Sequence, residues 1–156
     1  MKSQFDPGLS WKDVEWLRSI WKGPILIKGI QTVEDALIAV DSGVEAIAIS
    51  NHGGRQLDEA PTPFDLLPEV AEAVQDRLEI ICDGGARRGS DIVKAVSLGA
   101  TAVMAGRPYL YALAACGERG VDHVLDLLHE GVERTMSLTG AASVDDLTKE
   151  LISRTE

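Results

Sequence analysis

The feature that most constrains the fold is a short apolar run followed by glycine and charged residues, which recurs four times along the chain. The runs cover residues 24–29, 45–49, 78–82 and 101–105. Short apolar runs bounded by turn residues are typical of buried strands, and a stretch with helical periodicity follows each of them. Alternating strands and helices indicate an α/β fold with a parallel sheet. We therefore expect four βα units whose polar residues gather at the carboxyl end of the sheet.

The helices that follow these runs are expected at residues 32–41, 64–77, 92–98 and 109–138, with a break near 117–120. Thr32 is expected to cap the first of them, and Ser90 or Asp91 the third. Another helix, at 11–21, begins after Ser10, for which Asp13 would complete a capping box. Its apolar stripe is expected to lie in the core and contains Trp11, Val14, Leu17 and Ile20. A short final helix is expected at 143–147.

Size and composition limit the class of protein. The 156 residues suit one domain, so residues 1–156 are expected to form a single unit. The net charge of −10 argues against a nucleic-acid partner and against attraction to anionic membranes. Cys82 and Cys116 lie in apolar contexts, which favours small core residues in a reduced, cytoplasmic protein. No spacing of cysteine, histidine and carboxylate predicts a metal site, and no run is long enough to be a membrane span or signal peptide.

The most informative polar stretch is Ser50-Asn51-His52-Gly53-Gly54-Arg55-Gln56, directly after the second strand. His52 can change protonation near neutral pH, and the planar cation of Arg55 suits a carboxylate. The two glycines let the backbone approach a ligand closely. These residues suggest a small acid substrate that loses a proton. On spacing alone, an ordinary charged surface loop is an equally good interpretation.

The other strand ends carry polar groups of the same kind. Lys28 ends the first strand, where it would either contact an anion or be solvated. Asp83 ends the third strand and can accept hydrogen bonds from hydroxyl groups. Gly106 and Arg107 follow the fourth strand, and a glycine with a cation there is typical of a phosphate site in (β/α)8 barrels. A complete barrel needs eight strands and about 250 residues. The predicted fold is therefore the C-terminal half of a TIM (β/α)8 barrel.

The motifs resemble a known family. Residues 50–56, together with Lys28-Gly29, residues 83–89 and residues 106–108, are similar to the FMN-dependent α-hydroxy acid dehydrogenases and oxidases. That family includes glycolate oxidase, lactate oxidase and dehydrogenase, mandelate dehydrogenase and flavocytochrome b2. The resemblance covers essentially the whole chain in family order. It implies an FMN cofactor and, in the full-length barrel, oxidation of a lactate-like 2-hydroxy acid to the 2-oxo acid.

The resemblance also implies a role for each motif residue. His52 would be the base that takes the substrate proton, and Arg55 would bind the substrate carboxylate. Lys28 would lie at the pyrimidine edge of the flavin, and Ser50 would also touch the flavin. The ribityl chain and phosphate would be held by Asp83, Gly84, Gly85, Arg87, Gly106 and Arg107.

The N-terminal half of the family barrel has no counterpart in this sequence. In the family it supplies further flavin contacts and an aspartate that pairs with the catalytic histidine. The isolated chain is therefore expected to bind FMN poorly and to turn over little. Its two sheet edges would lack partners. We expect a homo-oligomer, or pairing with the N-terminal half.

Three alternatives stay open. A family member that oxidises a peptide-derived precursor, as in mycofactocin maturation, is weakly indicated by residues 5–13. An inactive half-barrel fragment that only self-associates is a second. The third is a relative of inosine monophosphate dehydrogenase. It would need a catalytic cysteine in a loop, whereas Cys82 is expected in a strand and Cys116 in a helix.

Overall fold

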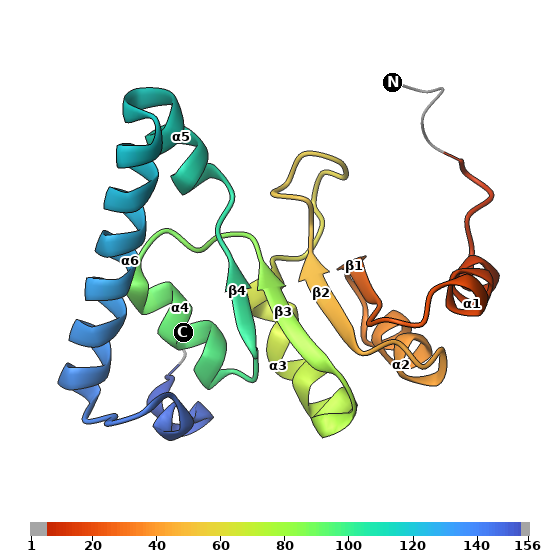
Figure 1. Cartoon of the computed structure of the whole chain (residues 1–156). Helices are drawn as coiled ribbons and strands as arrows, with labels where there is room; N and C mark the ends of the chain where they lie inside the picture. The colour runs from red at the N-terminus through yellow and green to blue at the C-terminus, as the bar shows by residue number, and fades with distance from the viewer. Residues whose placement is uncertain (1–5, 154–156) are drawn as a thin grey trace.

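The computed structural model describes residues 6–153 as a parallel sheet flanked by helices (Figure 1). The strands are β1 (Leu26–Ile30), β2 (Ala46–Ser50), β3 (Glu79–Asp83) and β4 (Ala102–Met104). The helices are α1 (Trp11–Ile20), α2 (Val33–Asp41), α3 (Pro63–Val74), α4 (Gly89–Ser97), α5 (Arg107–Cys116) and α6 (Glu118–Thr139). Short 3₁₀ helices are η2 (Gln75–Arg77), η3 (Val144–Asp146) and η4 (Lys149–Leu151). The four expected βα units are confirmed.

The sheet order is β1-β2-β3-β4, and every neighbouring pair is parallel. The register places Ser50 beside Asp83, and Asp83 beside Met104. Parallel strands in sequential order bring all four carboxyl ends to one end of the sheet. Figure 1 shows the loops after β2 and β3 and the start of α5 at that end. β1 and β4 form the two edges of this sheet, as the sequence predicted.

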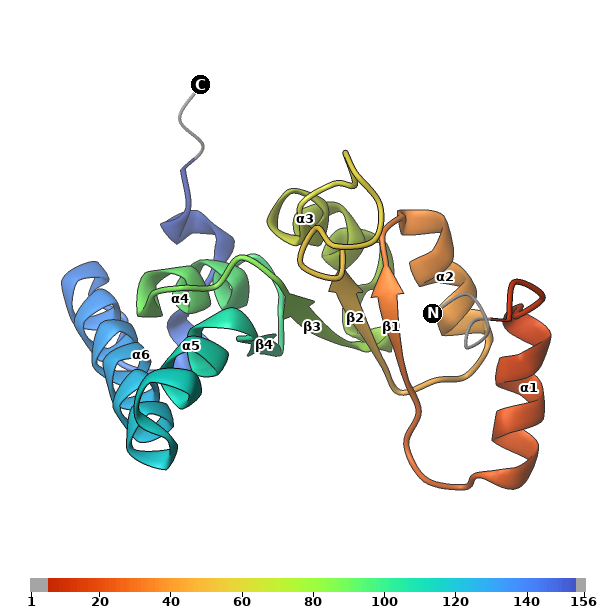
Figure 2. The ribbon, with the colours of Figure 1, turned by 90° about the horizontal axis from the view of Figure 1, so that it is seen from above.

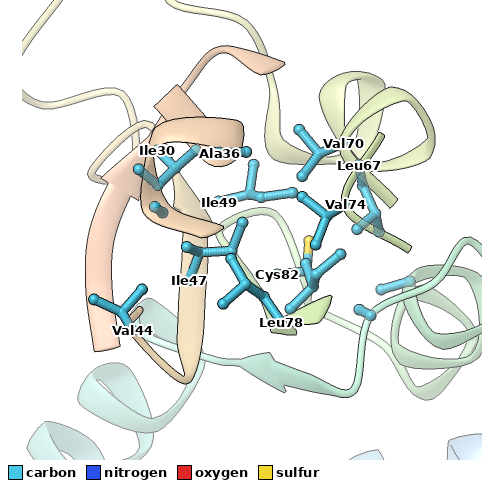
Figure 3. Packing of buried hydrophobic residues seen from close by; sticks show 14 of the residues in the cluster. Ile30, Ala36, Val44, Ile47, Ile49, Leu67, Val70, Val74, Leu78 and Cys82 are labelled. Atoms are coloured by element: carbon cyan, nitrogen blue, oxygen red, sulfur yellow. The ribbon is translucent and has the colours of Figure 1, made fainter. Parts of the chain in front are cut away.

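The hydrophobic core lies between the sheet and the helices that cover one of its faces. Leu67, Val70 and Val74 of α3 point toward Ile49 and Cys82 of the sheet (Figure 3). All five side chains are almost fully buried. Burying an aliphatic side chain of this size contributes about 1.5 to 3 kcal/mol, so this cluster is the main source of stability. Burial also raises the pKa of the Cys82 thiol to about 11, which leaves it an unreactive core residue.

The opposite face of the sheet is much more open. Seen from above, α2 and α3 cover one side of the sheet, α1 lies beyond β1, and α5 and α6 lie beyond β4 (Figure 2). Leu26 on β1 and Met104 on β4 are 41% and 42% exposed. The chain exposes 10765 Å², whereas a monomeric protein of its mass is expected to expose roughly 7,600 Å². This excess fits a sheet that forms part of a larger barrel.

Several sequence predictions are wrong in detail. Helix α1 has no fully buried residue, and Leu17 and Ile20 of the predicted stripe are exposed because the helix lies at the margin of the sheet. Only Trp11 and Val14 pack against the core. Cys116 is exposed on α5, although its apolar neighbours suggested a core position. No helix within residues 6–153 has both the length and the apolar character needed to cross a membrane.

The start of α4 also differs from the prediction. The helix begins at Gly89, and Arg88 takes the N-cap position that Ser90 or Asp91 was expected to hold. The Asp91 carboxylate instead accepts hydrogen bonds from the backbone amides of Arg87 and Arg88, each at 3.0 Å. These bonds satisfy amide groups at the beginning of the helix, as a capping residue would. They also determine the path of the loop that carries Arg87.

Candidate active site

Three polar side chains from three neighbouring strands meet at the carboxyl end of the sheet. The Lys28 ammonium lies 2.6 Å from Oδ2 of Asp83 and donates to Oγ of Ser50 at 3.0 Å. The Ser50 hydroxyl in turn donates to Oδ2 of Asp83 at 2.7 Å. Ser50 is fully buried, whereas the side chains of Lys28 and Asp83 are 39% and 17% exposed. The cluster therefore carries a balanced pair of charges at the border between core and solvent.

The environment of Asp83 favours its ionised form. Partial burial raises the pKa of this carboxyl, but hydrogen bonds from Lys28 and Ser50 and the positive charge of Lys28 outweigh it. The net result is a pKa below the ordinary value, with a smaller contribution from His52. Asp83 is thus a carboxylate that keeps the Lys28 ammonium at the strand ends.

This carboxylate gives the stability a pH dependence. An acid whose pKa is lowered by folding contributes stability above its ordinary pKa of 3.8 and loses it as the pH falls through the lower, folded-state value. We expect Asp83→Asn to reduce the free energy of unfolding at pH 7 by about 1 kcal/mol, because the ion pair with Lys28 is lost. The loss is modest because solvent screens the partly exposed Lys28. Urea unfolding of wild type, Asp83→Asn and the exposed control Asp58→Asn from pH 7 to pH 3 measures this. The Asp83→Asn difference should shrink toward pH 3, and a difference that stays constant with pH would contradict the assignment.

The loop after β2 holds His52 in an uncommon backbone conformation. Its φ is +55°, in the left-handed region that non-glycine residues seldom adopt. The His52 amide donates to Oγ of Ser50 at 3.1 Å, and the Gly53 amide donates to Oδ1 of Asn51 at 3.1 Å. Left-handed residues that the surrounding structure holds in place are common at functional sites. These bonds present the His52 side chain at the strand ends.

Gly29 provides the space for the His52 ring. It lies in β1 at an irregularity in the pairing with β2, with φ at +101°. A Cβ atom at this position would lie 3.2 Å from both Cε1 and Nε2 of His52. The imidazole therefore lies next to the Gly29 backbone. Its neighbour Lys28 lies in the middle of β1 and not at the end of the strand, where the sequence predicted it.

A second group of cations lies near the same loop. Arg107, the first residue of α5, donates from Nη2 to the Gly53 carbonyl oxygen at 3.3 Å. Arg87 comes from the loop between β3 and α4. Gly84 and Gly85 have φ values of +120° and +89°, and nothing lies within 4 Å of a Cβ placed at Gly106. The backbone here is open to a ligand, with two guanidinium groups beside it.

These elements enclose a groove of about 300 Å³, at the lower end of small-molecule sites. Nine of the ten predicted site residues line it: Lys28, His52, Arg55, Asp83, Gly84, Gly85, Arg87, Gly106 and Arg107. The tenth, Ser50, is buried beneath it. Other lining residues were not predicted, among them Met104, Pro108 and Leu110. Among residues 6–153, no three histidine, cysteine or acidic side chains gather to hold a metal ion.

Asn51 is a structural residue of the site that sequence reasoning overlooked. Its side chain accepts from the Gly53 amide and donates to the Pro61 carbonyl oxygen at 3.3 Å. It therefore connects the two ends of the loop that carries His52 and Arg55. An asparagine directly before a residue in a left-handed turn is the signal that could have revealed it.

Sequence comparison identifies the family. The FMN-dependent dehydrogenase family matches residues 1–154 of the chain. The chain belongs to this family. It is 54% identical over 154 residues to the peroxisomal (S)-2-hydroxyacid oxidase GLO4 of Arabidopsis thaliana, covering 99% of this chain and 42% of that protein. It is 53% identical over 142 residues to the pre-mycofactocin synthase of Mycobacterium tuberculosis, covering 91% of this chain and 36% of that protein. The chain thus spans about two fifths of these relatives.

Solved structures agree with this assignment. A mutant flavocytochrome b2 with pyruvate bound matches 94% of this chain and 38% of its own, with a TM-score of 0.92 and 43% identity. The four βα units are therefore half of a TIM (β/α)8 barrel, as the sequence predicted. The family resemblance deduced from residues 50–56 is confirmed as well. The roles of the individual site residues stay predictions.

The residues present fit FMN. Gly84, Gly85 and Gly106 line the groove without side chains of their own, and Arg87 and Arg107 offer two planar cations of the kind that bind phosphate. Lys28 lines the same groove, where it could face a polar edge of the flavin. The exposed Cys116 and the buried Cys82 provide no loop cysteine, which argues against the inosine monophosphate dehydrogenase alternative.

Proposed function

We propose that the assembled barrel to which this chain contributes uses FMN to oxidise a small, lactate-like 2-hydroxy acid to the 2-oxo acid. The observation that carries the proposal is the groove itself. It is lined by Lys28 of β1, by His52 and Arg55 of the loop after β2, and by the phosphate-type residues Arg87 and Arg107. The names of relatives, a 2-hydroxyacid oxidase and a flavocytochrome b2 with pyruvate bound, support the substrate class.

The chain's own residues account for proton handling and positioning. His52 lies at the strand ends with its ring against Gly29 and can accept the proton that the substrate loses. Arg55 follows on the same loop and can bind the substrate carboxylate through two parallel hydrogen bonds. A base and an anion clamp on one loop keep the reacting carbon at a constant distance from the base.

The residues that we expect to bind FMN interact with its negative charges. FMN, when bound, supplies the acceptor for the two electrons that leave the substrate. Lys28, kept in place by Asp83, can stabilise negative charge at the flavin edge. Arg87, Arg107 and the glycines at positions 84, 85 and 106 are expected to hold the ribityl phosphate. Poor FMN binding and little turnover by the isolated chain remain predictions, as does its self-association.

A peptide-derived substrate, as in mycofactocin maturation, is not better supported. The pre-mycofactocin synthase and the 2-hydroxyacid oxidase GLO4 are almost equally similar to this chain. Turnover of simple 2-hydroxy acids by the assembled enzyme would favour the first proposal. Turnover of the peptide-derived precursor alone would favour the second.

Flavin binding and reduction test the proposal directly. Visible spectra are recorded with FMN, and then with a 2-hydroxy acid under anaerobic conditions. We expect bleaching of the bound flavin in the assembled enzyme. Arg107→Gln should weaken FMN binding about tenfold, because a charge-assisted phosphate contact is lost. Riboflavin, which lacks the phosphate, should bind wild type and Arg107→Gln equally. Equal FMN affinity in both proteins would contradict the phosphate assignment, and no bleaching in the wild type would contradict the function.

A further inference from the structure

Three arginines line a second groove, between the start of α4 and the middle of α6. This groove has a volume of about 330 Å³, which is enough for a small molecule. Arg88 is the N-cap residue of α4 and Arg134 belongs to α6, whereas Arg87 lines both this groove and the candidate active site. The proposed function uses neither Arg88 nor Arg134.

A close contact between two glycines brings these arginines together. Gly89 begins α4, and a Cβ atom there would overlap with the carbonyl carbon of Gly131 in α6. The two helices therefore lie side by side at this point (Figure 1). Arg88 directly precedes Gly89, and Arg134 lies on the next turn of α6 after Gly131. Their side chains consequently line one groove, although they come from different elements.

The guanidinium groups have no acidic partner in this groove. Among residues 6–153, no aspartate or glutamate lines it, although the whole chain has a net charge of −10. The ion pairs found in the same part of the chain involve none of the three arginines. Two carboxylates nearby in sequence have other partners: Asp91 accepts from backbone amides, and Glu133 lies 3.3 Å from His129. Like charges that share a groove repel each other, and a bound anion offsets this repulsion.

The rest of the groove suits the body of an organic phosphate. Val124, Leu127 and Leu128 of α6 form an apolar wall, and Leu127 is 53% exposed. The Ser90 hydroxyl also lines the groove and can donate a hydrogen bond. Arginine binds phosphate through parallel hydrogen bonds, and an exposed apolar wall favours a ligand with a hydrocarbon part beside its phosphate.

We propose that this groove is a second anion site, adjacent to the expected FMN phosphate site, and that it binds a small organic phosphate. Arg88 and Arg134 hold the phosphate, and the apolar wall of α6 packs against the hydrocarbon part. The site does not depend on the first amides of α4, because Asp91 already accepts hydrogen bonds from the amides of Arg87 and Arg88. It is also independent of which acid the enzyme oxidises.

Isothermal titration calorimetry with phenyl phosphate tests the site in the assembled enzyme, saturated with FMN so that the first groove is occupied. We expect one saturable site per chain, and phenol, which lacks the phosphate, should bind at least about tenfold more weakly. Arg88→Gln and Arg134→Gln should each weaken binding about tenfold, because a charge-assisted phosphate contact is lost. Arg119→Gln is the matched control. It removes the same charge from an exposed position on α6 outside the groove, and it should change the affinity by less than about twofold.

Several results would overturn the proposal. Absence of saturable binding, or equal binding of phenol, would mean that the groove does not recognise phosphate. An equal loss in Arg119→Gln and Arg134→Gln would indicate general attraction to surface charge. Unchanged affinity in both groove variants would place the probe elsewhere, for example at Arg55. Binding to the isolated chain but not to the assembled enzyme would show that another part of the barrel fills the groove.

The two groove variants are independent tests of the site. Arg88 and Arg134 are both exposed and lie on different elements, so a folding defect in one variant leaves the other interpretable. Thermal unfolding of each variant provides this check. Bound FMN that is not bleached by a 2-hydroxy acid would contradict the proposed function, but the phenyl phosphate titration would still decide whether the second site exists.

Discussion

Replacing Gly89 with alanine is expected to lower the free energy of unfolding by about 3 kcal/mol, at the upper end of the cost of overpacking. Gly89 is the first residue of α4, and it faces the middle of α6. A Cβ atom there would overlap with the carbonyl carbon of Gly131 and the amide nitrogen of Val132. Both are backbone atoms of a 22-residue helix, which cannot rotate away as a side chain can. The two helices would have to separate.

Urea and thermal unfolding of the chain measure this effect, and Gly106→Ala is the matched control. Gly106 has φ at −93°, and nothing lies within 4 Å of a Cβ atom added there. The free energy of unfolding of Gly106→Ala should therefore differ from that of the wild type by less than about 0.5 kcal/mol. Gly131→Ala should also destabilise the chain, but less, because the added atom would lie 2.9 Å from the Gly89 nitrogen. A loss below about 0.5 kcal/mol in Gly89→Ala would show that α4 and α6 do not pack as closely as described.

In the assembled enzyme, His52→Gln is expected to reduce kcat by roughly 10² to 10⁴, the usual contribution of a positioned general base. Glutamine has a similar length and can still occupy the space above Gly29, but it cannot accept a proton near neutral pH. FMN affinity should be nearly unchanged, because the phosphate-type residues Arg87 and Arg107 remain. The kinetics with a simple 2-hydroxy acid, together with an FMN titration, measure both quantities.

His129→Gln is the control for this substitution. His129 is exposed on α6, where it lies 3.3 Å from Glu133 and outside the groove. Its replacement should leave kcat within about twofold of the wild type. If His52→Gln kept kcat within threefold as well, His52 would not be the base. If it instead abolished FMN binding, the residue would be part of the cofactor site.

Much of the fold follows from local sequence. Apolar runs at residues 45–49 and 78–82 had to be buried, and the helical stretches after them could return the chain for another parallel strand. Once the strands are parallel, residues that directly follow them must meet at one end. The functional groove was therefore predictable in outline, because His52 follows β2 and Asp83 ends β3, although Lys28 lies in the middle of β1. The glycines at positions 53 and 84 marked the loops that leave this end.

The sequence by itself thus determined the βα alternation, the end of the sheet that carries the site and the residue types in it. Only the tertiary structure decided which of these residues touch. The three bonds of Ser50, the space that Gly29 leaves for His52 and the contact between Gly89 and Gly131 join positions 2 to 42 residues apart. Such contacts depend on strand register and helix packing, which a local pattern does not specify. For the same reason, the exposure of α1 and of Cys116 could not be predicted, since burial depends on which other elements cover a residue.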